Sequence, residues 1–156
     1  MKNYVRPIAI VVIKRERPAG QRDEDDAILV FEGYDSHKDQ IFYRPLGGTI
    51  EFGEPAEQTV HRELREELNL ELCDVHYLGT VENIFTCEGQ PGHEIVMIFS
   101  ARLAAATAHV YDQDDIRGTE DDGQPFLARW MPLSHFGPDR LPLYPTGLFE
   151  LLIEEK

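Results

Sequence analysis

Three glutamates, Glu63, Glu66 and Glu67, crowd into five positions of the stretch "GTIEFGEPAEQTVHRELREELNL", residues 48–70. Like charges three or four residues apart on a helix repel, by about 0.2–0.5 kcal/mol per pair. On a helical wheel the three carboxylates fan along the edge of an apolar stripe, where a carboxylate is costly unless it is paired or bound to a metal. Because oxygen ligands suit hard cations, the spacing indicates a site for Mg²⁺ or Mn²⁺.

A helix over residues 55–69 would carry these carboxylates. Pro55 suits the first helical position, and Asn69 can adopt the left-handed conformation that ends a helix. An ordinary solvated helix, with an ion pair from Arg62 to Glu66, is the alternative interpretation. The apolar stripe repeats every four residues, at Ala56, Val60, Leu64 and Leu68.

Glycines precede this helix and favour the metal interpretation. Gly47, Gly48 and Gly53 let the backbone approach a ligand and present carbonyl or N–H groups to it. We expect residues 45–48, "PLGG", to form a turn outside regular structure, followed by a short strand at residues 49–52, "TIEF".

Residues 48–70 resemble the Nudix box of the Nudix hydrolases: a glycine, five residues, a glutamate, seven residues and then R-E-U-x-E-E-x-G-U, where U is bulky and apolar. Gly48 and Glu54 fill the first two fixed positions, and the last nine positions run from Arg62 to Leu70. Every fixed position matches except Asn69, which stands where the family has glycine. Since asparagine is the next best residue for a left-handed cap, we expect the chemistry to be retained.

The resemblance implies an α/β fold, a Nudix-like α/β/α sandwich with a mixed central β-sheet, as a single domain over residues 1–156. It implies a MutT-like pyrophosphohydrolase that uses Mg²⁺ or Mn²⁺ to cleave a diphosphate bond in a nucleoside diphosphate linked to another moiety. Glu63, Glu66 and Glu67 then correspond to the metal-binding carboxylates, and Gly48 adds its backbone carbonyl. Water attacks phosphorus, and a carboxylate accepts its proton.

The identity of that general base stays open among several carboxylates. Glu66 and Glu67 are candidates on the helix itself. Nudix enzymes that sanitise oxidised nucleotides carry an extra carboxylate before a G-Q-P and a final strand with W-M, and this chain reads "EDDGQPFLARWMPL". That likeness makes Glu120 and Asp122 candidates, against the alternative of a solvated acidic loop. Glu94, at the start of a predicted strand, is a rival, although a glutamate there is more often exposed.

Arg44 is the first candidate for binding substrate, because a guanidinium just before the glycine turn can reach phosphate oxygens. A structural ion pair with Glu51 or Glu54 is the alternative. Gly47 and Glu94 are further substrate-binding candidates. Four aromatic residues either stack on a base or, more commonly, belong to the core: Phe42, Tyr43, Phe85 and Trp130.

Patterning along the rest of the chain predicts a mixture of strands and helices. The runs at 74–87 and 93–103 flank "EGQPG" and should pair as an antiparallel hairpin. Residues 104–125 are expected to form a long acidic loop of the kind that is functional or mobile. Further strands are expected at 5–13, 27–32, 41–44 and 126–133, and an amphipathic helix at 145–156.

Composition narrows the function classes. The 156 residues are 42% apolar, which suits one hydrophobic core, and the formal net charge of −14 repels duplex nucleic acid and anionic membranes. A small phosphorylated nucleotide remains a suitable partner, because divalent cations neutralise both sides. No apolar run approaches the about 20 residues of a membrane helix. Cys73 and Cys87 lack a CxxC spacing and indicate reduced thiols in a cytoplasmic protein.

Two other functions remain on the sequence alone. One is a non-catalytic Nudix-fold nucleotide-binding sensor, and the other is an isomerase of the isopentenyl diphosphate type, which would use Cys87. The substrate also stays open among nucleoside triphosphates, ADP-ribose, other nucleotide sugars and dinucleoside polyphosphates. Residues 14–26 and 112–125 are the expected specificity loops. Pairing as a homodimer is left open.

Overall fold

A computed structural model describes residues 3–16 and 26–154 of the chain. Most of the expected specificity loop at 14–26, and the last two residues of the expected C-terminal helix, therefore lie outside the described residues.

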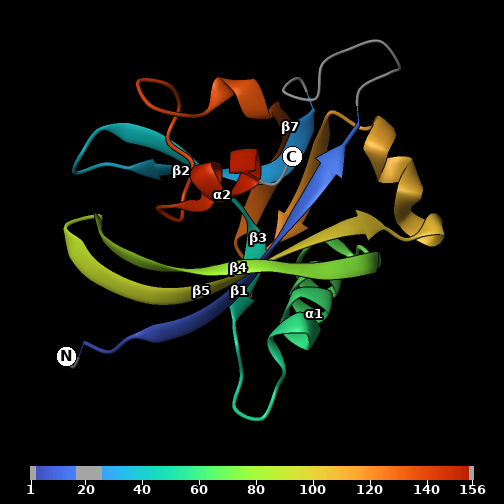
Figure 1. Cartoon of the computed structure of the whole chain (residues 1–156), viewed down its shortest axis with the longest axis horizontal. Helices are drawn as coiled ribbons and strands as arrows, with labels where there is room; N and C mark the ends of the chain where they lie inside the picture. Colours follow the sequence, from blue (N-terminus) through green and yellow to red (C-terminus); the bar gives the residue numbers. More distant parts are fainter. Residues whose placement is uncertain (1–2, 17–25, 155–156) are drawn as a thin grey trace.

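Among the described residues, seven strands form one sheet in the order β4-β5-β1-β3-β2-β7-β6 (Figure 1). β1 and β5 run parallel, whereas the other pairs in that order are antiparallel, so the expected mixed sheet is confirmed. The strands are β1 (Arg6–Arg15), β2 (Ala27–Asp35), β3 (Gln40–Thr49), β4 (Leu72–Cys87), β5 (Gln90–Leu103), β6 (Asp115–Thr119) and β7 (Pro125–Pro132).

β1 explains how the sheet organises two cores. Successive strand residues point to opposite faces. Ala9, Val11 and Ile13 join a cluster that includes Val60 and Leu64 of α1 (Ala56–Leu68). The alternate residues Ile8, Ile10 and Val12 join a cluster with residues of α2 (Leu148–Glu154). The two helices thus cover opposite faces, and a strand buried on both faces reads as a continuous apolar run (Figure 1).

The hairpin of β4 and β5 forms as predicted. Its register runs from Leu72 opposite Leu103 to Cys87 opposite Gln90, and the turn lies at residues 88–89. Glu88 and Gly89 both have positive φ, at 53° and 75°, which glycine adopts freely and which short polar residues tolerate better than branched ones.

Three local predictions are wrong. Residues 45–48 are not a turn but belong to β3, where Leu46, Gly47 and Gly48 pair with β1. Of the short strand expected at residues 49–52, Thr49 is the last residue of β3, residues 50–52 are not a strand, and Phe52 is fully exposed. The expected loop at 104–125 contains the 3-10 helix η2 (Ala105–Asp112) and β6, which leaves a five-residue turn at 120–124.

Helix α1 begins one residue later than expected. Pro55 is its N-cap, and its carbonyl accepts hydrogen bonds from the N–H groups of Gln58 and Thr59 at 2.9 and 3.2 Å. Asn69 ends the helix in the left-handed conformation, with φ 56°, and the Leu70 N–H returns to the Leu64 carbonyl at 3.1 Å. The substitution of asparagine for the family glycine therefore preserves the helix end.

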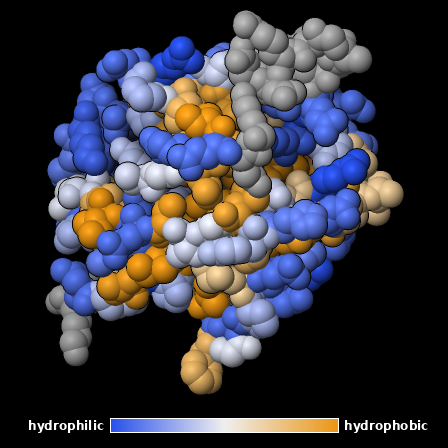
Figure 2. Space-filling model, viewed as in Figure 1, coloured by the Kyte–Doolittle hydropathy of each residue, from blue (hydrophilic) through white to orange (hydrophobic). Residues whose placement is uncertain are grey.

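Among the described residues, no helix is long and apolar enough to cross a membrane. On the face drawn in Figure 2, apolar patches lie between hydrophilic regions.

Candidate metal and substrate site

Four carboxylates gather where α1 meets the turn between β6 and β7, and we call Glu63, Glu66, Glu67 and Asp121 the acidic cluster. Ligand oxygens of Glu63, Glu66 and Asp121 all lie within 4.8 Å of one another. Glu63 is buried, whereas Glu66 and Asp121 are exposed. An oxygen-only donor set open to solvent on one side fits a hard divalent cation.

Glu67 is the most perturbed member of the acidic cluster. Burial, a hydrogen bond with Glu63 and the nearby charges of Glu63, Asp121 and Glu120 raise its pKa to about 9. Its ionisation is unfavourable first because burial removes water from the charge and then because each of these neighbours is itself a carboxylate. A divalent cation would reverse that balance, so the electrostatics also fit a metal site.

Arg62 offsets part of the repulsion among the glutamate carboxylates of α1. Its guanidinium donates to Glu54 at 2.7 and 3.0 Å, to Glu63 at 3.0 Å and to Glu66 at 3.3 Å. A further hydrogen bond, at 3.1 Å, reaches the Thr49 carbonyl at the end of β3. The expected pair of Arg62 with Glu66 is thus one contact of a larger network that fixes the start of α1 against β3.

Glu54 shows the effect of this arginine most clearly. Its carboxylate accepts from Arg62, from the Thr59 hydroxyl at 2.7 Å and from the Glu51 N–H at 3.2 Å. The Arg62 hydrogen bonds lead the causes that lower the pKa of Glu54 to about 2. Glu51 and Glu54 therefore pair with Arg62, at 3.6 and 2.7 Å, and not with Arg44 as one alternative supposed.

Asp121 is the residue that the sequence did not single out. Asp122, which did stand out, accepts a hydrogen bond from the Gln124 N–H at 3.0 Å within its own turn. Glu120 is exposed and contributes to the raised pKa of Glu67. The sequence does not indicate which of the acidic residues 120–122 faces α1. That depends on the conformation of the turn between Thr119 and Pro125, which pair across β6 and β7.

Gly47 and Gly48 meet different neighbours. A Cβ on Gly48 would lie 2.5 Å from Oε1 of Glu63, so the glycine lets this carboxylate lie against the β3 backbone. A Cβ on Gly47 would lie 2.1 Å from the Ala9 carbonyl oxygen. Gly47, a substrate-binding candidate by sequence, is thus required by the close approach of β1.

Arg44 and Glu94 form an ion pair at 3.7 Å, beside a cavity of about 80 Å³ that we call the small cavity. Arg44 lines this cavity, whereas Glu94 lies behind it and is 1% exposed, contrary to the expectation for a strand start. Neither residue belongs to the acidic cluster. Burial lowers the pKa of Arg44, and the Glu94 charge opposes that shift.

The four aromatic candidates separate into two groups. Tyr43 and Trp130 are core residues, each 6% exposed, and Trp130 stacks on Tyr111 with ring centroids 5.6 Å apart. Phe42 and Phe85 instead line the small cavity. Tyr144, which the sequence did not flag, lies edge-on to Phe42 with ring centroids 5.8 Å apart in the same wall.

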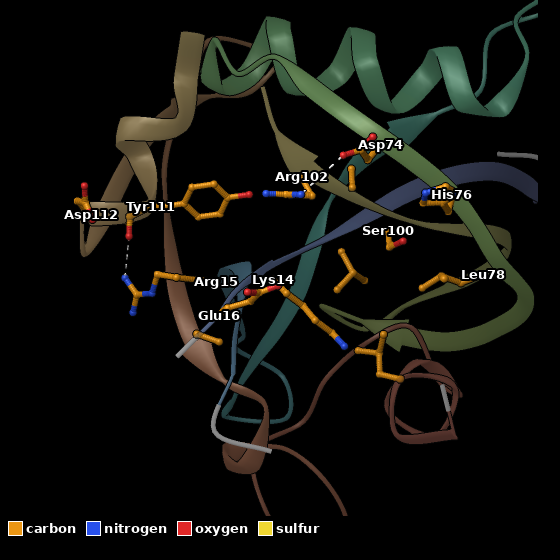
Figure 3. Close-up of a pocket in the computed structure, with 14 residues that line it drawn as sticks. Lys14, Arg15, Glu16, Asp74, His76, Leu78, Ser100, Arg102, Tyr111 and Asp112 are labelled. Atoms are coloured by element: carbon orange, nitrogen blue, oxygen red, sulfur yellow. Dashed lines mark hydrogen bonds and ion pairs between the residues drawn. The ribbon is translucent and has the colours of Figure 1, made fainter. Parts of the chain in front are cut away.

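A larger cavity of about 1130 Å³ lies at the other end of β1 and β5 (Figure 3). None of the predicted site residues lines it. Its charged side chains include Lys14, Arg15 and Arg102 but also Glu16, Asp74 and Asp112. Arg102 pairs with Asp74 at 3.9 Å, and Arg15 donates to the Tyr111 carbonyl at 3.4 Å. Because its charges balance, this cavity favours no class of ligand.

Comparison with known proteins gives a family match over most of the chain. The family model described as the NUDIX domain matches residues 6–150. This range contains the acidic cluster, the Arg62 network and the small cavity.

Solved structures resemble the fold over nearly its whole length. A MutT NUDIX hydrolase from Burkholderia pseudomallei is 22% identical, with a TM-score of 0.60 and 98% of each chain covered. A NUDIX hydrolase from Nitrosomonas europaea is 17% identical, with a TM-score of 0.58, covering 97% of this chain and 87% of that one. The E. coli ORF135 protein is 20% identical, with a TM-score of 0.52, covering 97% and 91%.

Proposed function

The chain belongs to the Nudix family, and on that premise we propose that it is a metal-dependent hydrolase that cleaves a diphosphate bond in a nucleoside diphosphate linked to another moiety. The observation that carries the proposal is the convergence of Glu63, Glu66 and Asp121, with ligand oxygens within 4.8 Å of one another. Mg²⁺ or Mn²⁺ is the proposed cofactor, because these ions prefer carboxylate, carbonyl and water ligands.

Each residue of the site has a proposed role. Glu63, Glu66 and Asp121 hold the cation, and the Gly48 carbonyl is a further ligand. Glu67 adds a fourth carboxylate, which ligates the cation or accepts the proton of the attacking water. Arg62 holds Glu63 and Glu66 in place through its hydrogen bonds. A bound divalent cation supplies charge neutralisation at the phosphate oxygens and lowers the pKa of a bound water.

The small cavity, of about 80 Å³, is the proposed contact for part of the remaining substrate, since a whole nucleoside needs a larger pocket. Arg44 would donate to phosphate oxygens, and the rings of Phe42 and Phe85 would contact the base. Arg44 and Gly48 are four residues apart on β3, or about 13 Å along the strand, so one extended nucleotide can touch both regions.

The test is replacement of one carboxylate of the acidic cluster. We expect Glu67→Gln to lower Mg²⁺-dependent release of phosphate or pyrophosphate by about 100-fold or more, because ligand and proton acceptor are both affected. Release is measured over a panel of nucleoside triphosphates, nucleotide sugars and dinucleoside polyphosphates. Glu57→Gln, an equivalent change at an exposed position of α1, is the matched control.

An unchanged rate in Glu67→Gln would refute this mechanism. Nucleotide binding by the wild-type protein without turnover in Mg²⁺ or Mn²⁺ would support the sensor instead. The isomerase alternative has less support, because burial leads the causes that raise the pKa of Cys87, and a protonated thiol is a poor nucleophile. Both cysteines are free, which supports the proposed cytoplasmic location.

A further inference from the structure

Glu94 is a fully buried carboxylate that the proposed chemistry does not use. It lies on β5 between two cross-strand neighbours, Arg6 on β1 and Asn83 on β4. Its side chain is 1% exposed, and an unpaired charge so deeply buried would be strongly destabilising.

Both oxygens of Glu94 are occupied by protein groups. Oε2 accepts from the Arg6 guanidinium at 2.5 Å. Oε1 accepts from the Asn83 amide at 3.3 Å and pairs with Nη2 of Arg44 at 3.7 Å. A carboxylate held on both oxygens and shielded from solvent cannot readily ligate a cation or accept a proton from water.

Two of these partners line the small cavity. Arg44 is 20% exposed and Asn83 is 2% exposed, and both contribute to the cavity wall, whereas Glu94 does not. A guanidinium has five N–H donors, so an ion pair at Nη2 leaves other donors for a ligand. The other charged residues that line the cavity, Lys38 and Asp35, pair with each other at 3.9 Å, so Arg44 leaves one positive charge in excess among the lining residues, in a chain whose net charge is −14.

The Asn83 amide extends the network to the far wall of the cavity. Its Oδ1 accepts from the Thr146 N–H at 3.2 Å. The neighbouring Tyr144 donates its N–H to the Tyr43 carbonyl at 2.8 Å and contributes its ring to the wall. One chain of contacts thus links Arg44, Glu94 and Asn83 to the segment that carries Tyr144.

We propose that Glu94 is a positioning residue, neither metal ligand nor general base, that fixes the Arg44 guanidinium and the Asn83 amide at the small cavity so that Arg44 binds an anionic oxygen of a nucleotide. This inference rests on the proposed function for the identity of the ligand. Its effect falls on substrate binding and not on the chemical step.

The experiment compares Glu94→Gln with the wild-type protein. We expect KM to rise about tenfold or more while kcat changes less than about threefold, because glutamine no longer forms the ion pair that holds the Arg44 guanidinium in position at the cavity. Glu82→Gln is the matched control: Glu82 is also a strand carboxylate in an ion pair, with His93 at 3.2 Å, but it is 61% exposed. A fall in kcat at unchanged KM, or unchanged kinetics in a folded Glu94→Gln protein, would overturn the proposal.

Direct binding separates this inference from the proposed function. ADP binding is measured by calorimetry without divalent metal, so turnover is not required. Glu94→Gln should weaken ADP binding about tenfold, and Arg44→Gln/Glu94→Gln should bind no more weakly than Arg44→Gln alone, because Glu94 acts through Arg44. If Glu94→Gln alone does not fold, the double variant, which removes both charges of the pair, is compared with Arg44→Gln instead. Additive losses, or a wild-type protein that does not bind ADP, would refute the positioning role even if the hydrolase proposal stands.

Discussion

The acidic cluster and the Glu94 network neutralise their carboxylates in opposite ways. Glu94 has two arginines and an amide at its two oxygens. Among the described residues, the four-carboxylate acidic cluster forms ion pairs with one arginine, Arg62, through Glu63 and Glu66, and this arginine also pairs with Glu51 and Glu54. A carboxylate that is neutralised by arginine side chains of the same protein, as Glu94 is, has a structural role.

The acidic cluster is incompletely neutralised by the described residues, and this leaves its carboxylates available to a metal ion. Carboxylates that lie close together disfavour one another's ionised form, and together with burial they raise the pKa of Glu67. A cation that binds there gains both the attraction and the relief of that repulsion. The proposed catalytic residues therefore lie in the acidic cluster, and the proposed substrate-binding residues lie in the Glu94 network.

Gly48→Ala is expected to damage the acidic cluster most selectively. The new Cβ would lie 2.5 Å from Oε1 of Glu63, and the flexible carboxylate can move away while the backbone stays in place. We therefore expect activity to fall about 10- to 100-fold, with the melting temperature nearly unchanged. Mg²⁺-dependent release of phosphate and thermal denaturation measure the two effects.

Gly47→Ala is the matched comparison at the adjacent position. Its Cβ would lie 2.1 Å from the Ala9 carbonyl, and backbone cannot yield as a side chain does. We expect a loss of about 1–3 kcal/mol in the free energy of unfolding. If Gly48→Ala unfolds the protein as readily as Gly47→Ala, the contrast between the two glycines is wrong.

The β6–β7 turn gives a prediction of intermediate size. Asp121→Asn should raise the Mg²⁺ concentration for half-maximal activity about tenfold, because it removes a charged ligand from the acidic cluster. Asp122→Asn and Glu120→Gln should change it less than about threefold. A larger effect at Asp122 would favour the choice that the sequence alone suggests.

The acidic cluster contains features that the sequence predicts and one, in the β6–β7 turn, that it does not predict. The helix, its stripe and the Asn69 end could be predicted because they depend on residues three or four positions apart. The choice among three adjacent acids depends on the register of two strands, and the burial of Glu94 depends on Arg6 and Asn83, which are distant in sequence. Position 94 reads as an exposed strand start until its cross-strand neighbours are known.

The conformation of the two glycines of β3, Gly47 and Gly48, also depends on tertiary contacts. A "PLGG" run indicates a turn by local propensity, yet these residues pair with β1 as a strand. The reason is tertiary, since only glycine permits the approach of Ala9 on one side and Glu63 on the other. The segment at 104–125 also differs from the expected loop, because Val110 and Ile116, which are both buried, anchor it to the core.

The prediction for pH compares Glu54 with Glu67. The pKa of Glu54 is lowered to about 2, so its contribution to stability is present above its ordinary value of 4.5 and is lost as pH falls toward 2. The pKa of Glu67 is raised to about 9, so the folded protein holds a proton that the unfolded chain releases above 4.5. Stability therefore falls as pH rises from 4.5 through 9.

In EDTA, the melting temperature should thus decline on both sides of a maximum near pH 4.5, by a few degrees for each kcal/mol lost. Glu67→Gln should flatten the alkaline side and Glu54→Gln the acid side. Millimolar Mg²⁺ should raise the melting temperature of the wild-type protein at neutral and alkaline pH by more than that of Glu67→Gln, since the cation replaces the proton as the partner of this carboxylate. A melting temperature insensitive to Mg²⁺ would mean that the acidic cluster is an ordinary helix surface, and its contrast with Glu94 would then lie in burial alone.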